Sequence, residues 1–150
     1  MITPVTLRDL LSDDAPAIQR IYSGESVAFT TGKPITIEEA ADKISSWGRD
    51  AFGITVHGDL IGVVKIHSRT ASTGSISYIL REDSWGRGYA TEAVRQIVDF
   101  AFNIVCLERL EAKHHPDNPA SGRVLAKAGF TCHGLHDDFV SYALEKERTA

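Results

Sequence analysis

The sequence has few cysteines, no strong excess of charge and no long uninterrupted apolar run. Cys106 and Cys132 are the two cysteines among 150 residues, and they fit neither a disulfide framework nor a paired metal-ligand spacing. A formal net charge of −4 gives no reason to expect nucleic acid or an anionic membrane as a partner. The longest apolar stretch, residues 93–107, is interrupted by polar side chains. The start of the sequence lacks the pattern of a signal peptide, so we expect a cytoplasmic protein with reduced thiols.

The composition is that of an ordinary globular protein. Hydrophobic residues make up 43% of the chain and charged residues 24%. No repeat, linker or low-complexity segment divides it. The length and composition together predict one domain, residues 1–150, with a single hydrophobic core.

Hydrophobic periodicity predicts strands and helices in a mixed order. Strands are predicted at 5–10, 51–57, 60–68, 74–80, 109–115, 130–134 and 138–145. Helices are predicted at 12–22, 34–47, 88–105 and 119–128. The third helix is a crossover between two strands, so those strands run parallel. The sequence therefore predicts an α/β fold with a mixed sheet whose faces are covered by helices.

Capping and turn residues mark the ends of several of these elements. The signals are an N-cap at Ser12 or Asp13, a capping box formed by Thr36 and Glu39, a hairpin turn at Gly58–Asp59, and Asn118, Pro119 and Gly129 around the last helix. They predict helix and hairpin boundaries from short-range chemistry alone.

A glycine-containing loop, SWGRGYATEA at 84–93, joins a predicted strand to the long helix. The first N–H groups of a helix lack internal partners, and the helix dipole adds partial positive charge there. Gly86 and Gly88 have no Cβ, so an oxygen-rich ligand can approach the backbone closely, and Arg87 adds a full charge. The loop therefore predicts a phosphate or pyrophosphate site.

Four other interpretations of the glycine loop are weighed against a phosphate site of this kind. The glycines can serve turn geometry alone, or belong to a different anion-binding α/β protein. A dinucleotide-binding site of the Rossmann type is disfavoured, because the third glycine is missing and antiparallel-looking strands precede the loop. A Walker loop is excluded, because the sequence contains no Gly-Lys-Ser/Thr.

Six separated pieces of sequence favour one family. SYIL, WGRGYATEA, ERLEA, NPAS, KAGF and SYAL occur in the order typical of the GNAT superfamily of acetyl-CoA-dependent N-acetyltransferases, which the chain resembles. It resembles most closely the branch that includes the ribosomal-protein N-terminal acetylases. The resemblance covers residues 5–146 and is most specific over 76–134. It implies a GNAT-like fold, with a mostly antiparallel sheet of about seven strands, a parallel splayed pair, and helices on both faces.

The resemblance also implies where the cosubstrate acetyl-CoA binds. The family's loop pattern falls on Trp85, Gly88 and Ala90, and Trp85 departs from the commonest residue at its position. The residues implied to hold the coenzyme pyrophosphate are Arg87, Gly88, Tyr89, Ala90 and Thr91, with Trp85 as a packing wedge. In the splayed pair, Tyr78, Ile79 and Leu80 are implied to line the pantetheine arm like an added strand. A backbone N–H there, placed at Tyr78, would stabilise the oxyanion.

The last predicted helix carries two further implied contacts. Asn118 is implied to bond the pantetheine, alongside its role as N-cap. Many relatives place a proton-donating tyrosine in this helix, but that position is Leu125 here. Ser121 is the candidate for a hydrogen bond to the coenzyme sulfur, and a solvent-facing helix serine is the alternative. A thiol is already a fair leaving group, so a weak donor can suffice.

The general base is not identified. Other members carry a glutamate early in the strand at 74–80, which is absent here. The remaining candidates are Glu82, Asp83, Asp137, Asp138, His114 and His115. Neighbouring strand residues face opposite sides, so at most one of the two histidines can face the cleft. A zinc site built from His114, His115 and His133 is rejected because nothing completes its ligand set, and we expect no metal.

The predicted function is transfer of an acetyl group from coenzyme A directly to a primary amine, either a protein N-terminus or a small molecule. Segments 20–36 and 133–140 are expected to form the acceptor pocket, with the first as a mobile lid. The alternative is a non-catalytic acyl-CoA-binding or sensor module of the same fold, since the usual tyrosine and glutamate are missing. A homodimer formed through the last strands is an open possibility.

Overall fold

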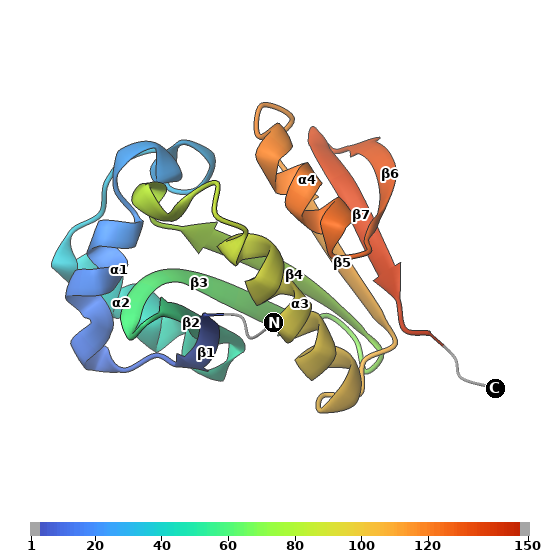
Figure 1. The fold of residues 1–150 in the computed structure, drawn as a ribbon, viewed down its shortest axis with the longest axis horizontal. Helices are drawn as coiled ribbons and strands as arrows, with labels where there is room; N and C mark the ends of the chain where they lie inside the picture. The colour runs from blue at the N-terminus through green and yellow to red at the C-terminus, as the bar shows by residue number, and fades with distance from the viewer. Residues whose placement is uncertain (1–3, 148–150) are drawn as a thin grey trace. The chain divides into compact units, whose positions relative to one another are not determined.

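The computed structural model describes residues 4–147, in which seven strands form one hydrogen-bonded sheet (Figure 1). The strand order is β1-β2-β3-β4-β5-β7-β6. The β1–β2, β2–β3, β5–β7 and β6–β7 pairs are antiparallel, and the β4–β5 pair is parallel. The predicted mixed sheet with one parallel pair is therefore confirmed.

The element bounds follow the predicted order closely. The strands are β1 (Val5–Asp9), β2 (Ala51–Val56), β3 (Asp59–Ser68), β4 (Thr73–Leu80), β5 (Arg109–His114), β6 (Thr131–His136) and β7 (Phe139–Glu145). The α-helices are α1 (Ala15–Ile21), α2 (Ile37–Trp47), α3 (Tyr89–Asn103) and α4 (Pro119–Lys127). Short 3₁₀ turns are η1 (Ser12–Asp14), η2 (Gly24–Phe29), η3 (Gly48–Asp50) and η4 (Glu82–Ser84). In the part of the chain with described coordinates, no helix is both long and apolar enough to cross a membrane.

The chain divides into two compact units, of which the first comprises residues 4–65 and 78–93. Its core is the contact of α1 and α2 with β2, β3 and the end of β4 (Figure 1). Ile18 and Ile21 point from α1 into this core and are fully buried, as is Val63 of β3. Burial of each such side chain contributes roughly 1.5–3 kcal/mol. Ile79 of β4 belongs to the same cluster, so the core fixes the strand that leads into the glycine loop.

Local chemistry sets some boundaries in this unit as predicted and shifts others. Thr36 and Glu39 form the predicted capping box, with both hydrogen bonds 3.1 Å long. The predicted cap at Ser12 or Asp13 is wrong, because those residues form η1 and the N-cap of α1 is Asp14. The Asp14 carboxylate is bound by Arg8 and by the Leu11 N–H instead.

The hairpin turn is displaced by one residue from the predicted position. Val56 pairs with Asp59, so the two turn residues are His57 and Gly58, with φ values of 52° and 82°. Two positive φ values are the requirement of a type I′ turn, which matches the twist of the flanking strands. Asp59 is therefore the first residue of β3, and its carboxylate is available to Arg81.

The second unit comprises residues 66–77 and 94–147. β5 pairs along its whole length with β7, from Arg109–Glu145 to His114–Val140. Its parallel pairing with β4 is short and joins residues 73–75 to residues 109–111. Leu107, Leu110 and Leu125 are fully buried here, and α4 packs against β5. The short parallel pairing agrees with the predicted splayed pair.

Close packing of β3 against β4 generates the first prediction. A Cβ on Gly62 would lie 2.5 Å from the backbone oxygen of Ile79, which cannot move without shifting β4. A Cβ on Gly53 would lie 2.7 Å from the tip of Leu60, which can rotate. We expect Gly62→Ala to lower the free energy of unfolding by roughly 1–3 kcal/mol and Gly53→Ala by less than about 1 kcal/mol. Urea titrations of the two variants measure this, and equal losses would contradict it.

Candidate functional site

The loop between β4 and α3 holds both glycines in a conformation that other residues avoid. Gly86 and Gly88 have φ values of 75° and 81°. A Cβ on either glycine would meet nothing within 4 Å beyond its chain neighbours, so the space above them is open. The positive φ values are a sufficient reason for glycine at both positions, as in an ordinary turn. The open space also leaves the backbone accessible to a ligand.

Helix α3 begins at a glycine. The carbonyl oxygen of Gly88 accepts the Glu92 N–H at 3.2 Å, which makes Gly88 the N-cap residue. A glycine has no side chain with which to accept the N–H groups of the first turn, at Tyr89, Ala90 and Thr91. These donors and the positive end of the helix dipole lie beside the exposed Arg87. Phosphate groups bind at helix starts of this kind, and the phosphate site at this loop stays a prediction from the sequence.

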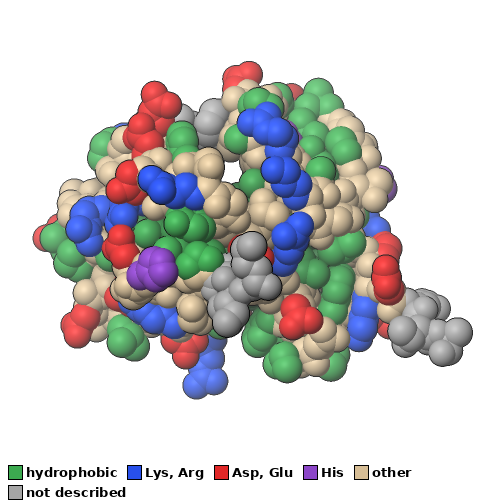
Figure 2. Space-filling view, viewed as in Figure 1, with side chains coloured by type: hydrophobic (Ala, Val, Ile, Leu, Met, Phe, Trp, Pro, Cys, Tyr) green, Lys and Arg blue, Asp and Glu red, His purple; other side chains and the backbone are tan. Residues whose placement is uncertain are grey.

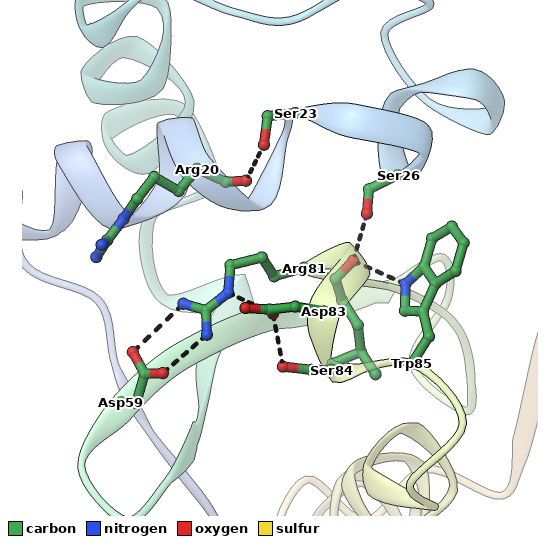
Figure 3. Close-up of polar contacts among 9 residues, drawn as sticks. Arg20, Ser23, Ser26, Asp59, Arg81, Asp83, Ser84 and Trp85 are labelled. Atoms are coloured by element: carbon green, nitrogen blue, oxygen red, sulfur yellow. Dashed lines mark hydrogen bonds and ion pairs between the residues drawn. The ribbon is translucent and has the colours of Figure 1, made fainter.

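The end of β4 is fixed by two hydrogen bonds to one atom (Figure 3). The carbonyl oxygen of Leu80 accepts the Ser26 hydroxyl at 2.7 Å and the Trp85 indole N–H at 3.1 Å. Both lone pairs of the oxygen are then used. Trp85 is 44% exposed and is held by its nitrogen, so it secures the start of the glycine loop to β4. Sequence reasoning missed Ser26, which lies 54 residues before its partner.

Arg81 fixes the other side of the same turn by binding two carboxylates (Figure 3). Its guanidinium contacts Asp59 at 2.8 Å and Asp83 at 2.7 Å. Hydrogen bonds from Arg81 lower the pKa of both carboxyl groups. A carboxylate with a lowered pKa is a weaker base, so Asp83 is a poor candidate for deprotonating an amine. Glu82 accepts the N–H of Glu25 at 2.9 Å, which ties η2 to the same loop.

The backbone direction of β4 is set by β3. Arg81 donates its N–H to Ile61, and the Ile79 oxygen approaches Gly62. Because backbone groups alternate along a strand, those of Tyr78 and Leu80 point away from β3. The side chains of Ile79 and Leu80 are 8% and 7% exposed, so contact of either with a ligand must use the backbone. The Leu80 carbonyl oxygen already accepts two hydrogen bonds, so a backbone contact of Leu80 with a ligand would be made by its N–H.

In the second unit, α4 begins at the predicted residue but without the predicted capping bond. Asn118 is the N-cap and Pro119 the first helical residue, yet the Asn118 side chain makes no cap hydrogen bond. The Asn118 amide therefore does not cap the helix. Ser121 lies partly exposed in the first turn. Leu125 is 1% exposed, so the position of the family's tyrosine is part of the core.

The structure separates the two adjacent histidines at the end of β5. His114 is 8% exposed, and its ring contacts Tyr142 of β7 at 3.2 Å. His115 is exposed, and its Nδ1 accepts the Asp117 N–H at 3.1 Å. The opposite orientations agree with strand alternation. The partnership of His114 with Tyr142 was missed by sequence reasoning, because it depends on the register of β5 and β7.

The remaining candidate groups lie at the surface. Asp137 and Asp138 form the β6–β7 turn and are both exposed, with φ values of 50° and 69°. Both cysteines are exposed and free. Within residues 4–147 no three metal-ligating side chains come together. On the face drawn in Figure 2, basic side chains gather over α4, where Arg123 and Lys127 are exposed.

Comparisons with known proteins agree with this geometry. The family model described as acetyltransferase (GNAT) domain matches residues 5–131. An uncharacterised N-acetyltransferase of Bacillus licheniformis is 30% identical over 148 residues, covering 90% of this chain and 83% of the relative. YjcK, a probable N-acetyltransferase of Bacillus subtilis, is 38% identical over 109 residues, covering 69% of this chain and 60% of YjcK.

A solved structure extends the likeness to three dimensions. Mycobacterium smegmatis RimJ, in complex with CoA-disulfide, is similar with a TM-score of 0.83 at 25% identity, over 94% of this chain and 81% of RimJ. The matched family region includes β4, the glycine loop and the first turn of α4. The chain therefore belongs to the acetyltransferase (GNAT) family and is an N-acetyltransferase.

Proposed function

We propose that the protein transfers the acetyl group of acetyl-CoA directly to a primary amine. The observation that carries this proposal is the start of α3, where the N-cap glycine has no side chain to accept the first-turn N–H groups and the space above it is open. The two phosphates that link the halves of coenzyme A can accept hydrogen bonds from these N–H groups. RimJ, at 25% identity, is known in complex with a coenzyme A derivative, which supports the choice of ligand.

The residues proposed to hold acetyl-CoA come from three segments. The backbone from Arg87 through Thr91, including Gly88, Tyr89 and Ala90, binds the pyrophosphate. The backbone of Tyr78 and the N–H of Leu80 bond the pantetheine amides, beside Ile79 in the core. The Tyr78 N–H is the proposed donor to the oxyanion, an interaction commonly worth about 3 kcal/mol. Asn118, whose amide makes no capping bond, is proposed to bond the pantetheine, and Ser121 the sulfur.

We propose a peptide α-amine as the first acceptor to examine, because the sequence resembles the ribosomal-protein acetylase branch. The segment 20–36, expected to line the acceptor pocket, is tied to the coenzyme loop through Glu25 and Ser26. These bonds reduce the freedom of the expected lid near Glu25. The segment expected to bind the acceptor and the loop proposed to bind the coenzyme are therefore joined by hydrogen bonds within the first unit.

Binding of acetyl-CoA is tested by matched substitutions of two glycines. We expect Gly88→Glu to raise the Kd for acetyl-CoA at least tenfold, equal to about 1.4 kcal/mol. The new carboxylate would occupy the helix start and repel the anionic phosphates from it. Gly58→Glu is the control, since Gly58 has φ 82° against 81° for Gly88 and equally open space. Calorimetry with acetyl-CoA, and with ATP as a competing phosphate ligand, measures both. Equal weakening by the two variants would contradict the proposed site.

The acceptor class is tested by thiol release from acetyl-CoA. We expect thiol release with a lysine-free peptide that has a free N-terminus. The same peptide acetylated at its N-terminus should give no release. Spermidine and kanamycin are measured in parallel as small-molecule amines. Release with those amines alone would overturn the peptide acceptor while keeping the transferase. Acetyl-CoA binding with no release from any amine would favour the non-catalytic acyl-CoA module.

A further inference from the structure

Two lysines lie over the same aromatic ring in the first unit. Nζ of Lys65, on β3, is 5.1 Å from the ring centre of Trp47, the last residue of α2. Nζ of Lys43, also on α2, is 5.9 Å from that ring centre and 5.0 Å from the ring centre of Tyr22. The rings of Tyr22 and Trp47 are 6.2 Å apart. These four side chains form what we call the lysine–aromatic cluster.

The charged part of the lysine–aromatic cluster is accessible and its base is buried. Lys43, Trp47 and Lys65 are each partly exposed, whereas Tyr22 is 4% exposed. Trp47 packs at the margin of the core beneath α1 and α2. Lysine stems can cover aromatic surface while the charged ends stay in contact with water. A molecule in solution can therefore reach both amines and the indole.

Neither lysine has a carboxylate as partner. Within residues 4–147, no carboxylate oxygen lies at ion-pair distance from Lys43 or Lys65. Burial and the charge of Lys43 lower the pKa of the Lys65 amine. Glu39 lies one turn before Lys43, but its carboxylate is bound to Thr36 in the capping box. Burial raises the pKa of Tyr22 to about 12, so its hydroxyl is uncharged at neutral pH.

Two like charges on one aromatic surface favour the binding of an anion. A partly buried cation is normally paired, because its removal from water costs free energy. The ring faces attract both amines, but a ring carries no net charge. A carboxylate beside the two amines would supply the counter-charge and reduce their mutual repulsion. The indole in the same cluster favours an anion that belongs to an organic molecule over a free inorganic ion.

The lysine–aromatic cluster lies beside the segments that the proposed function uses. Tyr22 belongs to segment 20–36, which is expected to line the acceptor pocket. Val63 packs in the core beneath α1 and α2, so Lys65, two residues later on β3, faces the same side of the sheet. The sheet neighbour of β3 is β4, whose Tyr78 N–H is the proposed donor to the oxyanion. The cluster is therefore placed where an acceptor would bind.

The lysine–aromatic cluster is also separate from the proposed pyrophosphate site. The turn that leads into the glycine loop begins at Arg81, whose N–H donates to the Ile61 oxygen. Lys65 lies four residues further along β3, which is about 13 Å in an extended strand. One coenzyme pyrophosphate at the glycine loop therefore does not serve the two lysines.

We propose that the lysine–aromatic cluster binds a carboxylate of the acceptor, so that the acceptor is an amine that also carries an acidic group. This inference rests on the proposed function and narrows its substrate class. The carboxylate has two sources with the same chemistry. One is an acidic side chain close to the free N-terminus of a peptide, and the other is the α-carboxylate of a free amino acid. The experiment below separates them.

The central test removes the charge from the enzyme and from the acceptor in turn. Lys65→Met keeps a long side chain that can contact an aromatic ring, but it has no charge. One acceptor is a lysine-free peptide with a free N-terminus and glutamate at its second and third positions, and the other has glutamine there. We expect wild-type kcat/KM to be about tenfold higher for the glutamate peptide, through a lower KM. Lys65→Met should reduce this preference to less than about threefold.

The second source is measured with alanine and alaninamide, which differ in the α-carboxylate. A preference confined to the peptide pair assigns the carboxylate to an acidic side chain. A preference confined to alanine assigns it to a free amino acid. The absence of a preference in both pairs, or a preference that Lys65→Met retains in full, would overturn the inference. Lys43→Met is a second variant on a different element, and it should weaken the same preference.

Lys113→Met is the matched control, because Nζ of Lys113, an exposed residue of β5, lies 4.6 Å from the ring centre of Phe139. It should keep the wild-type preference, and thermal melting shows whether each variant folds. The Kd for acetyl-CoA should stay within about twofold of the wild-type value in Lys65→Met. A large loss of acetyl-CoA affinity in that variant would assign the lysines to a coenzyme phosphate and contradict the acceptor site.

Binding without turnover separates this inference from the proposed function. The glutamate peptide acetylated at its N-terminus, and N-acetylalanine for the second source, cannot react and resemble the products. We expect calorimetry to give a Kd at least about fivefold higher in Lys65→Met than in the wild type for one of them. That result without thiol release from any amine would keep the carboxylate site and overturn the transferase. Equal binding by the two proteins would overturn the carboxylate site, whatever the turnover.

Discussion

The first turn of α3 begins at a glycine, which has no side chain to accept its N–H groups. Several contacts of the first unit hold this helix start in place. The Leu80 oxygen, held by Ser26 and Trp85, fixes where β4 ends. Arg81, bound to two aspartates, fixes the turn that follows. A loop constrained from both sides loses little freedom when a ligand binds, and the free energy of each N–H contact is then retained as affinity.

Charge alone does not account for the anion site that we propose at this loop. Arg87 is accompanied by Glu82, Asp83 and Glu92, and the guanidinium of Arg81 is taken up by carboxylates. The lowered pKa of Asp83 keeps that carboxylate charged at neutral pH. In the proposed site the attraction therefore comes from directed N–H groups at short range rather than from a broad positive field.

The sequence predicted those features that depend on neighbours in the chain. The capping box at Thr36, the glycine loop and the start of α4 at Pro119 rest on residues within a few positions of one another. The hairpin turn moved by one residue because the φ values of the turn, not the residue types alone, decide the register. The bond from Ser26 to Leu80 spans 54 residues and that from His114 to Tyr142 spans 28. Tertiary packing creates these contacts, and the hydrophobic periodicity of the sequence does not predict them.

Helix α4 carries a core residue at the position of the family's tyrosine. Leu125 occupies the position of the family's tyrosine and is committed to the core, where its burial contributes roughly 1.5–3 kcal/mol. A proton-donating group on α4 would forfeit that burial. Gly122, one turn earlier, opens the helix surface to the Tyr142 hydroxyl. The contact of that hydroxyl with His114 depends in turn on the register of β5 and β7.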